Sequence, residues 1–182
     1  MIYGDKMKLY VMRHGRTDDN DLRILNGRHD EDINATGIAQ AEAAREIYEK
    51  LDIDLIICST MLRTRHTADI VNTKNLPIIY DERLIERDTG GLTGRSVFDE
   101  FRGVYWNYYS DEYDVEHVPD LFKRVHPVLD EIKEKYSDKN VMIVTHNGVI
   151  RAIHFYFNPL PEDGNILELG GVKNCEIKEY DL

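Results

Sequence analysis

Cysteine and long apolar runs are both scarce in this sequence of 182 residues. Its 2 cysteines cannot build the framework of bridges that holds small secreted domains together, and Cys58 lies in the apolar run 55–58, as a buried thiol does. We expect no disulfide and a reducing compartment. No apolar run approaches the roughly 20 residues that cross a bilayer, and residues 1–6 lack the basic start and apolar stretch of a secretory signal. The expected location is cytoplasmic, with no membrane partner.

Basic residues are also few. The chain has 23 lysines and arginines against 34 aspartates and glutamates, a formal net charge of −11. A duplex-binding protein needs a basic face that displaces condensed counterions, so this balance argues against a nucleic-acid partner. Arginines can still converge in one cleft of an acidic protein. A hydrophobic fraction of 42% is too high for a disordered chain, and we expect one compact domain over residues 1–182.

Four short β-prone runs are separated by segments long enough for helical crossovers. They cover residues 8–12, 55–58, 78–80 and 140–145. Because such crossovers join parallel strands, the pattern predicts an α/β fold with a mainly parallel central sheet. The tail, residues 174–180, is typical of an added edge strand, for which an antiparallel pairing is expected.

Helical periodicity fills the segments between these runs. Predicted helices cover residues 35–51, 60–71 and 149–157 and the stretch around 121–132. Asn34 precedes the first of them and is its expected N-cap. Pro127 lies inside the last stretch, where a proline is expected to kink the helix.

Residues 95–118 are predicted to form an excursion that covers one end of the sheet, and this excursion is a candidate lid. It is rich in aromatic and acidic residues, and no regular period is found after residue 99. The aromatic run 105–109 either stacks on a substrate or packs the excursion onto the core, and packing is the favoured interpretation. Arg95 and Arg102 either reach the far end of a substrate or, as favoured, remain solvated.

Two of the predicted strands are each followed by a histidine. His14 follows the first strand and His146 follows the last of the four. In open α/β sheets ligands bind beyond the carboxyl ends of the strands, so both histidines are expected in one site. Arg63 begins a helix after the second strand and is expected at the same edge, beside the free N–H groups of that helix.

The arginines of this edge indicate a phosphate pocket. Arg13 and Arg63 each offer a planar fork of donors, and a helix N-terminus adds favourable partial charge for an anion. Thr17, Asn20 and Arg28 lie in the loop after the first strand and could donate to the phosphate or to the rest of the substrate.

No metal-binding motif is present. Neither a His-Glu-x-x-His nor a Cys-x-x-Cys pair occurs in the chain. Four further histidines lack paired ligand spacing and are interpreted as surface or core residues: His29, His117, His126 and His154. We expect neither a metal nor a cofactor.

The order and spacing of the motifs resemble the histidine phosphatase superfamily, which also contains cofactor-dependent phosphoglycerate mutases. Five blocks between residues 8 and 151 match in family order: Arg13-His14-Gly15-Arg16-Thr17 with Asn20; Leu25-Asn26-Gly27-Arg28 with Asn34, Gly37 and Gln40-Ala41; Ser59, Leu62, Arg63 and Thr67-Ala68; Leu84, Glu86, Gly90 and Gly94; and Val144-Thr145-His146-Asn147-Gly148 with Arg151. The resemblance implies a three-layer α/β/α fold of the phosphoglycerate mutase type.

The resemblance also implies a role for each catalytic residue. His14 would be the nucleophile and would form a phosphohistidine intermediate. Arg13 and Arg63 would grip the phosphoryl group, and His146 would steady its transferring oxygens. Glu86 would act as general acid and then as general base. His14 must be neutral to attack, and nearby arginine charge is expected to disfavour its protonation.

Some positions depart from the family pattern. Arg16 replaces a common acidic residue, Thr93 stands where many members have Glu, and residues 115–117 keep only the Glu of a frequent Gly-Glu-Ser. These departures affect the residues that would contact the rest of the substrate. In the last block, Asn147 is a further candidate phosphate contact.

Three functions are compatible with these motifs. The favoured one is a phosphatase that hydrolyses small-molecule phosphate monoesters, because the chain is short and lacks the arginine-rich insertion that mutases carry after the proton donor. The second is phosphoglycerate mutase-type phosphoryl transfer. The third is a non-catalytic module that binds a phospho-ligand or a protein partner, although every candidate catalytic position is filled.

Overall fold

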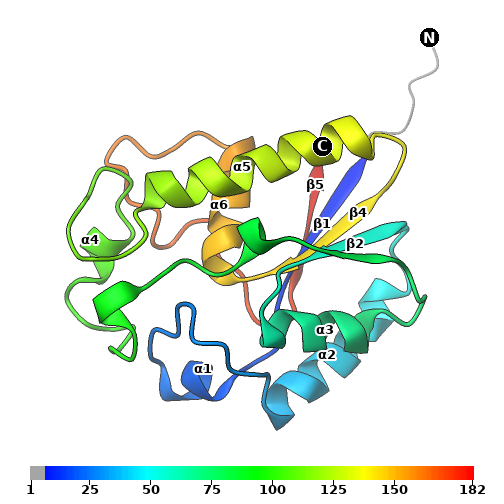
Figure 1. Ribbon diagram of the computed structural model, residues 1–182, viewed down its shortest axis with the longest axis horizontal. Helices are drawn as coiled ribbons and strands as arrows, with labels where there is room; N and C mark the ends of the chain where they lie inside the picture. The colour runs from blue at the N-terminus through cyan, green and yellow to red at the C-terminus, as the bar shows by residue number, and fades with distance from the viewer. Residues whose placement is uncertain (1–6) are drawn as a thin grey trace.

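The protein is described by a computed structural model that covers residues 7–182. The predicted absence of a secretory signal concerns residues 1–6, which lie outside this range. A central sheet stands between two helical layers (Figure 1). Its strands are β1 (Lys8–Arg13), β2 (Leu55–Cys58), β3 (Ile78–Tyr80), β4 (Val141–Thr145) and β5 (Ile177–Asp181). The fold is therefore the predicted three-layer α/β/α architecture.

The sheet has the order β3-β2-β4-β1-β5. β3, β2, β4 and β1 pair in parallel, and β5 pairs with β1 in antiparallel register. The tail thus forms the predicted edge strand, although β5 begins three residues later than expected and ends at Asp181. Because β4 is inserted between β1 and β2, the loops that follow these three strands meet at one edge.

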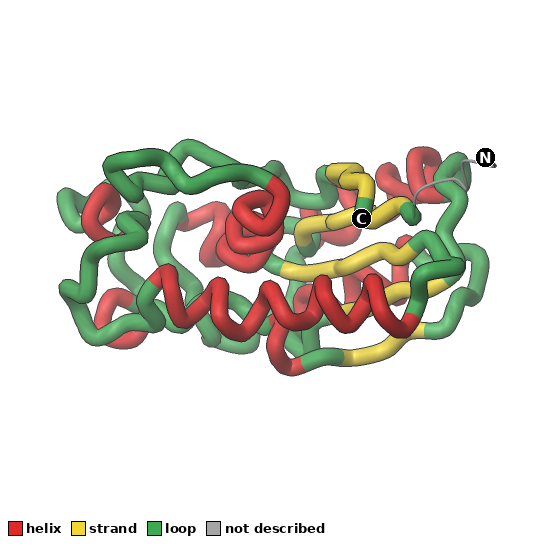
Figure 2. The backbone as a smooth tube through the Cα atoms, turned by 90° about the horizontal axis from the view of Figure 1, so that it is seen from above, coloured by secondary structure: helices red, strands yellow, loops and turns green. Residues whose placement is uncertain are grey.

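Alternate strand residues face opposite layers, as the period-2 geometry of a strand requires. Leu9 and Val11 of β1 join one buried cluster, which contains residues of α5 (Val118–Lys135) and α6 (Asn147–Phe157). Tyr10 and Met12 join the other, with α2 (Ala35–Tyr48) and α3 (Leu62–Val71). Figure 2 shows α5 running alongside the sheet. Two apolar cores therefore hold the strand ends in place.

The four longer helices, α2, α3, α5 and α6, agree with the predicted ones apart from their ends, whereas the short helix α1 (Asp18–Leu22) was not predicted. α2 begins at Ala35, and the Asn34 side chain accepts a hydrogen bond from the Gly37 amide at 3.1 Å, which confirms the N-cap. α6 begins two residues before the predicted start. α5 begins at Val118 and continues through Pro127 as one helix. Within residues 7–182, no helix combines the length and apolarity needed to cross a bilayer.

The predicted excursion contains one short helix, α4 (Arg102–Tyr105), among turns and loops. Its own apolar cluster consists of Phe101, Tyr105 and, from the preceding segment, Leu92. In Figure 1 this green segment lies beyond the end of the sheet, on the same side as α1 (Asp18–Leu22). The aromatic residues of the excursion therefore pack partly on one another, next to the edge where the strand loops meet.

Candidate active site

Strand pairing brings the two predicted histidines together. Arg13 pairs with Thr145 at the ends of β1 and β4, and the His14 amide donates to the Thr145 carbonyl at 3.0 Å. The two imidazole rings follow directly, with 5.2 Å between their centroids. The prediction that His14 and His146 lie at one site is confirmed by this geometry.

His14 is held in one tautomer by its backbone. The ring is 3% exposed, and its Nδ1 lies 2.7 Å from the Gly15 carbonyl oxygen. Because a carbonyl can only accept, Nδ1 carries the proton and Nε2 keeps its lone pair. Burial, with added repulsion from Arg13 and Arg63, holds the pKa of His14 well below its ordinary value. The ring is therefore neutral at physiological pH, as a nucleophile must be.

His146 is fixed by two side chains. Its Nδ1 accepts from Arg63 Nε at 3.2 Å, and its Nε2 lies 2.8 Å from Ser59 Oγ. Since arginine only donates, Nδ1 is unprotonated and Nε2 donates to the Ser59 hydroxyl. Burial, then Arg63 and His14, lower the pKa of His146 well below its ordinary value. Both histidines at this edge are thus neutral, and their protons are on different nitrogens.

The two predicted phosphate-binding arginines are both buried. Arg63 is 1% exposed and donates to the carbonyl oxygens of Gly27 and His29, at 2.9 and 2.8 Å. Arg13 donates to the Val172 carbonyl at 3.0 Å, while its Nε is buried with no hydrogen-bond partner among residues 7–182. Burial lowers the pKa of Arg13 to about 10, so it stays charged at neutral pH. The Nε–H group of Arg13 therefore remains available to donate a hydrogen bond to a bound anion.

Glu86 lies at the N-terminus of α6. Its Oε1 accepts from the amides of Arg87 and Gly148, at 2.8 and 3.1 Å, and its Oε2 has only a longer contact of 3.4 Å with Gly148. A Cβ at Gly148 would lie 2.4 Å from Oε1, so only glycine permits this approach. The helix end thereby positions the carboxyl group in the same cavity wall as His14.

A cavity of about 270 Å³ opens between these groups. Its wall includes six of the predicted residues: Arg13, His14, Asn20, Arg63, Glu86 and Asn147. His146 lies behind the wall, where Arg63 covers it. Asn20 and Asn147 are themselves anchored, because each side-chain oxygen accepts a hydrogen bond, from Asn174 at 3.1 Å and from the Val172 amide at 3.0 Å.

Two predicted contacts are not brought to the cavity wall. Thr17 is fully buried, and its hydroxyl caps α1 by accepting from the Asn20 amide at 3.3 Å. Arg28 is exposed, and its guanidinium pairs with Asp88 at 3.4 Å and Glu116 at 3.3 Å. The Thr17 hydroxyl is therefore occupied by capping α1, and the Arg28 guanidinium by ion pairs with acidic residues that are distant in sequence.

The excursion contributes part of the wall. Arg102, Tyr105 and Trp106 line the cavity, whereas Tyr109 is 67% exposed and lies outside it. Arg95 is also outside the wall and pairs with Asp99 at 2.8 Å. Within the aromatic run 105–109, Tyr105 and Trp106 therefore line the cavity, whereas Tyr109 lies outside it.

Glu116 anchors the excursion to the loop of Glu86. Its carboxylate receives Arg124 at 2.5 Å, and its own carbonyl accepts from Arg87. Burial raises the pKa of Glu116, but the hydrogen bonds and charge of Arg124, the Asp88 amide and the charge of Arg28 together outweigh burial and lower the pKa. Arg124 also donates to the Glu86 carbonyl at 3.2 Å. The one residue of 115–117 that matches the family pattern thus holds the segment that carries Glu86.

Several residues that shape the site were not assigned roles from the sequence. Ser59 positions His146, Thr67 Oγ1 accepts from the Gly15 amide at 2.9 Å, and Asn174 donates to the His14 carbonyl at 3.0 Å. Ser59 and Thr67 belong to the motif around Arg63, so their presence there was the available signal. Asn174 lies on the tail, far from every motif, and no sequence signal pointed to it.

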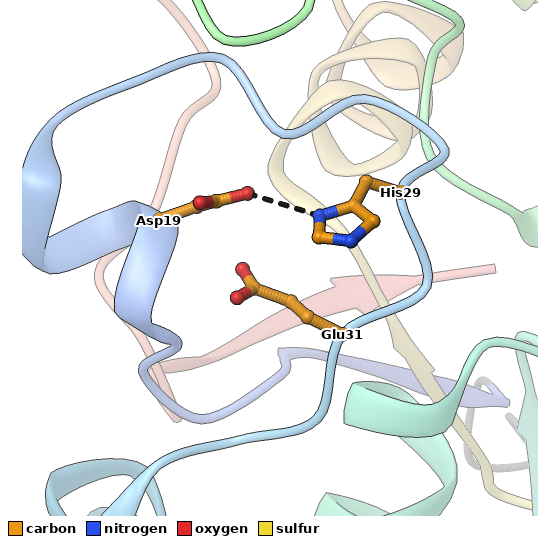
Figure 3. Close-up of side chains that lie close together, drawn as sticks. All are labelled: Asp19, His29 and Glu31. Carbon is orange, nitrogen blue, oxygen red and sulfur yellow. Dashed lines mark hydrogen bonds and ion pairs between the residues drawn. The ribbon is translucent and has the colours of Figure 1, made fainter.

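One group within residues 7–182 has the spacing of metal ligands. Asp19, His29 and Glu31 offer ligand atoms within 4.8 Å of one another (Figure 3). The Asn26 amide donates to both carboxylates, at 2.8 Å to Asp19 and 2.5 Å to Glu31. His29 Nδ1 lies 3.4 Å from the Asp19 carboxylate. The three side chains are thus joined by protein hydrogen bonds, an arrangement that no spacing motif indicated.

Paired histidines and buried arginines at the carboxyl edge of a mainly parallel sheet form the architecture of the histidine phosphatases. The chain belongs to the histidine phosphatase superfamily, branch 1, whose family model matches residues 9–181. This match confirms the resemblance seen in the motifs and the expected class of enzyme, which acts on phosphate esters.

Curated relatives and solved structures agree with this assignment. The chain is 35% identical over 155 residues to a probable phosphatase of Schizosaccharomyces pombe, covering 83% of this chain and 73% of the relative. It is 31% identical over 144 residues to the uncharacterized phosphatase PhoE of Bacillus subtilis, covering 79% and 73%. A mycobacterial glucosyl-3-phosphoglycerate phosphatase in complex with VO3 superposes with a TM-score of 0.83 at 25% identity, covering 95% and 90%.

Proposed function

We propose that this protein hydrolyses small-molecule phosphate monoesters through a phosphohistidine intermediate on His14. The observation that carries the proposal is the His14 tautomer. The Gly15 carbonyl accepts a hydrogen bond from Nδ1–H, and burial with arginine charge keeps the ring neutral, so the Nε2 lone pair is available beside a cationic cavity. The phosphatase names of several relatives support hydrolysis as the outcome.

The first step transfers the phosphoryl group to the enzyme. His14 Nε2 attacks phosphorus, a P–N bond forms, and the bond between phosphorus and the ester oxygen breaks. Arg13 and Arg63 neutralise the equatorial oxygens, which carry the charge of the transition state. Protonated Glu86 gives its proton to the departing alkoxide. Oε2 would carry that proton, because the shorter backbone hydrogen bonds go to Oε1.

The second step regenerates the enzyme. The Glu86 carboxylate takes a proton from water, the hydroxide oxygen attacks phosphorus, and the P–N bond breaks. The lone pair returns to His14 Nε2, and Glu86 is again protonated. Atoms and protons balance over the two steps, so one phosphate ester and one water give an alcohol and inorganic phosphate.

His146 is proposed to steady the transferring oxygens after a change of partner. A phosphate oxygen would replace His146 Nδ1 as the acceptor of Arg63 Nε. The Ser59 hydroxyl can then donate to Nε2, because a hydroxyl both donates and accepts, and Nδ1 can carry the proton. His146 would thus donate to the same oxygen that Arg63 binds.

The experiment is a hydrolysis assay with para-nitrophenyl phosphate. Wild type is expected to release nitrophenol and to be inhibited by orthovanadate, which mimics five-coordinate phosphorus. His14→Ala is expected to lose roughly a thousandfold or more of kcat/KM, because the covalent route is removed. His117→Ala, outside the cavity wall, is the matched histidine control. Equal activity in wild type and His14→Ala would exclude the mechanism.

A further inference from the structure

The chain segment just before β5 lies against the end of β1. Because β5 is antiparallel to β1, residues that precede β5 come next to residues that follow β1. The contact is direct, since the Cys175 amide donates to the Arg13 carbonyl at 3.0 Å. Asn174 is the neighbouring residue, and its side chain reaches the backbone of His14. The fold therefore places an asparagine of the tail beside the proposed nucleophile.

The orientation of the Asn174 amide is set by a group that can only accept. Its Nδ2 donates to the His14 carbonyl oxygen at 3.0 Å. A reversed amide would place Oδ1 against that carbonyl, with two oxygens and no hydrogen between them. Asn174 therefore presents Nδ2 on this side, and the second N–H of that nitrogen remains for another acceptor.

Asn20 receives this second N–H. Its Oδ1 accepts from Asn174 Nδ2 at 3.1 Å. If the Asn20 amide were reversed, two amide nitrogens would face each other, and neither could accept. Asn20 lines the cavity, and its own Nδ2 donates to no group of residues 7–182. The orientation fixed by the His14 carbonyl thus passes through Asn174 and leaves the N–H groups of Asn20 for a ligand of the cavity.

The same stretch of the tail orients a second amide of the cavity wall. The Val172 amide donates to Asn147 Oδ1 at 3.0 Å, so Nδ2 is the end of Asn147 that remains. The Val172 carbonyl accepts from Arg13 Nη1 at 3.0 Å. In Asn20 and Asn147 alike, the tail binds the side-chain oxygen. This arrangement favours an anion in the cavity, because amide N–H groups attract an anion and amide oxygens repel one.

We propose that Asn174 is a positioning residue for phosphoryl transfer, which keeps the Asn20 amide turned so that its N–H groups bind a phosphoryl oxygen. This inference rests on the proposed function, because it assigns Asn20 to the phosphoryl group that His14 attacks. Asn174 is not part of the cavity wall and acts through Asn20. Without Asn174 the Asn20 amide can reverse, and its oxygen then faces the negative charge of the substrate.

The test is a double-mutant cycle between Asn174 and Asn20, with para-nitrophenyl phosphate as the substrate. Asn20→Ala is expected to lower kcat/KM about tenfold, the effect of one hydrogen bond to an anion. Asn174→Ala is expected to lower it about three- to tenfold, because the Asn20 amide is then free to reverse. In the Asn20→Ala background, Asn174→Ala should change kcat/KM by less than about twofold, since no amide is left to orient.

Two further variants separate the orientation of the amide from its shape and from general damage. Asn174→Asp keeps the size of the side chain, but an ionised carboxylate offers only acceptors, so kcat/KM should fall at least as far as in Asn174→Ala. Asn158→Ala is the matched control, because Asn158 also donates to a backbone carbonyl, that of His154 at 2.8 Å, but lies outside the cavity wall. It should stay within about twofold of wild type. Near-ultraviolet circular dichroism gives the folded concentration of each variant.

Equal fold losses from Asn174→Ala in the two backgrounds, including no loss in either, would overturn the proposal, because a purely structural role does not depend on Asn20. Wild-type kcat/KM in Asn174→Asp would also overturn it. Failure of the proposed function gives a different result, in which wild type does not hydrolyse the ester. Calorimetric binding of inorganic phosphate then decides: a loss of affinity from Asn174→Ala that disappears in the Asn20→Ala background supports the positioning role, and an equal loss or no loss overturns it.

Discussion

The two buried histidines carry their protons on different nitrogens, and each choice is made by one neighbouring group. The Gly15 carbonyl accepts from Nδ1 of His14, whereas Arg63 donates to Nδ1 of His146 and leaves the proton on Nε2, next to the Ser59 hydroxyl. A carbonyl can only accept, so the tautomer of His14 is constant. A hydroxyl can reverse its role, so the tautomer of His146 can change when a phosphate binds. In the proposed mechanism, this difference separates a permanent nucleophile, His14, from an adaptable donor, His146.

Ser59→Ala tests the adaptable half of the pair. The substitution leaves His146 Nε2 buried without a partner, which should lower the free energy of unfolding by about 1–3 kcal/mol. It should also lower kcat about tenfold, because no hydroxyl then donates to His146 Nε2 when the ring proton is on Nδ1. Ser137→Ala, at an exposed serine, is the control. Chemical denaturation and steady-state kinetics measure both effects, and an unchanged kcat would contradict the tautomer change.

The two histidines and Arg63 could be predicted from the sequence, but the residues that hold side chains of the site in place could not. His14, His146 and Arg63 follow apolar runs whose strand character is clear from composition alone. Arg28, a candidate substrate contact, lies outside the cavity wall because its ion-pair partners, Asp88 and Glu116, come from segments far along the chain. Periodicity contains no information about such long-range pairs.

At the scale of elements, the N-terminus of α6 positions Glu86, the proposed general acid. Glu86 comes from the loop after β3, yet its carboxyl group rests on the Gly148 amide of α6. The strands and the Asn34 cap were predictable because their patterns are local. The start of α6 at Asn147 was not, because His146 and Gly148 favour a turn in isolation and the packing of the strand edge extends the helix.

Gly148→Ala is predicted to impair the acid while preserving the helix. The added Cβ would lie 2.4 Å from Glu86 Oε1 and must displace the carboxyl group. Hydrolysis of an alkyl phosphate should fall about 10- to 100-fold, because its alkoxide needs a proton. Hydrolysis of para-nitrophenyl phosphate should fall much less, because nitrophenolate leaves without one.

Gly103→Ala in α4 is the matched control, because no atom lies within 4 Å of the Cβ it adds. It should leave both rates unchanged. Equal losses on the two classes of ester in Gly148→Ala would contradict the placement of Glu86 as the acid. Steady-state kinetics on both esters, with a melting curve for each variant, make the comparison.

At the scale of the whole molecule, burial of two neutral histidines links stability to pH. Both have folded-state pKa values well below the ordinary value of 6.5, so the unfolded chain binds more protons as the pH falls below 6.5. Their contribution to stability is therefore fully present above that pH and is lost below it, at about 1.4 kcal/mol per pH unit for each histidine.

The variant His14→Asn should remove about half of this histidine-dependent slope. The measurement is the free energy of unfolding by urea between pH 7 and pH 5, for wild type, His14→Asn and His117→Asn. The last variant replaces a partly exposed histidine and should keep the full slope. An identical slope in wild type and His14→Asn would show that His14 is not buried in its neutral form.

The central claim concerns one covalent bond, between phosphorus and His14 Nε2. The most direct measurement is rapid quenching of Glu86→Gln with para-nitrophenyl phosphate in alkali, followed by peptide mapping by mass spectrometry. The first step needs no acid with this leaving group, whereas release of the phosphoryl group to water lacks its base. The account predicts one phosphoryl group on His14, stable in alkali and lost in acid, and none in His14→Ala/Glu86→Gln. Phosphate on a serine, an aspartate or His146 would contradict it.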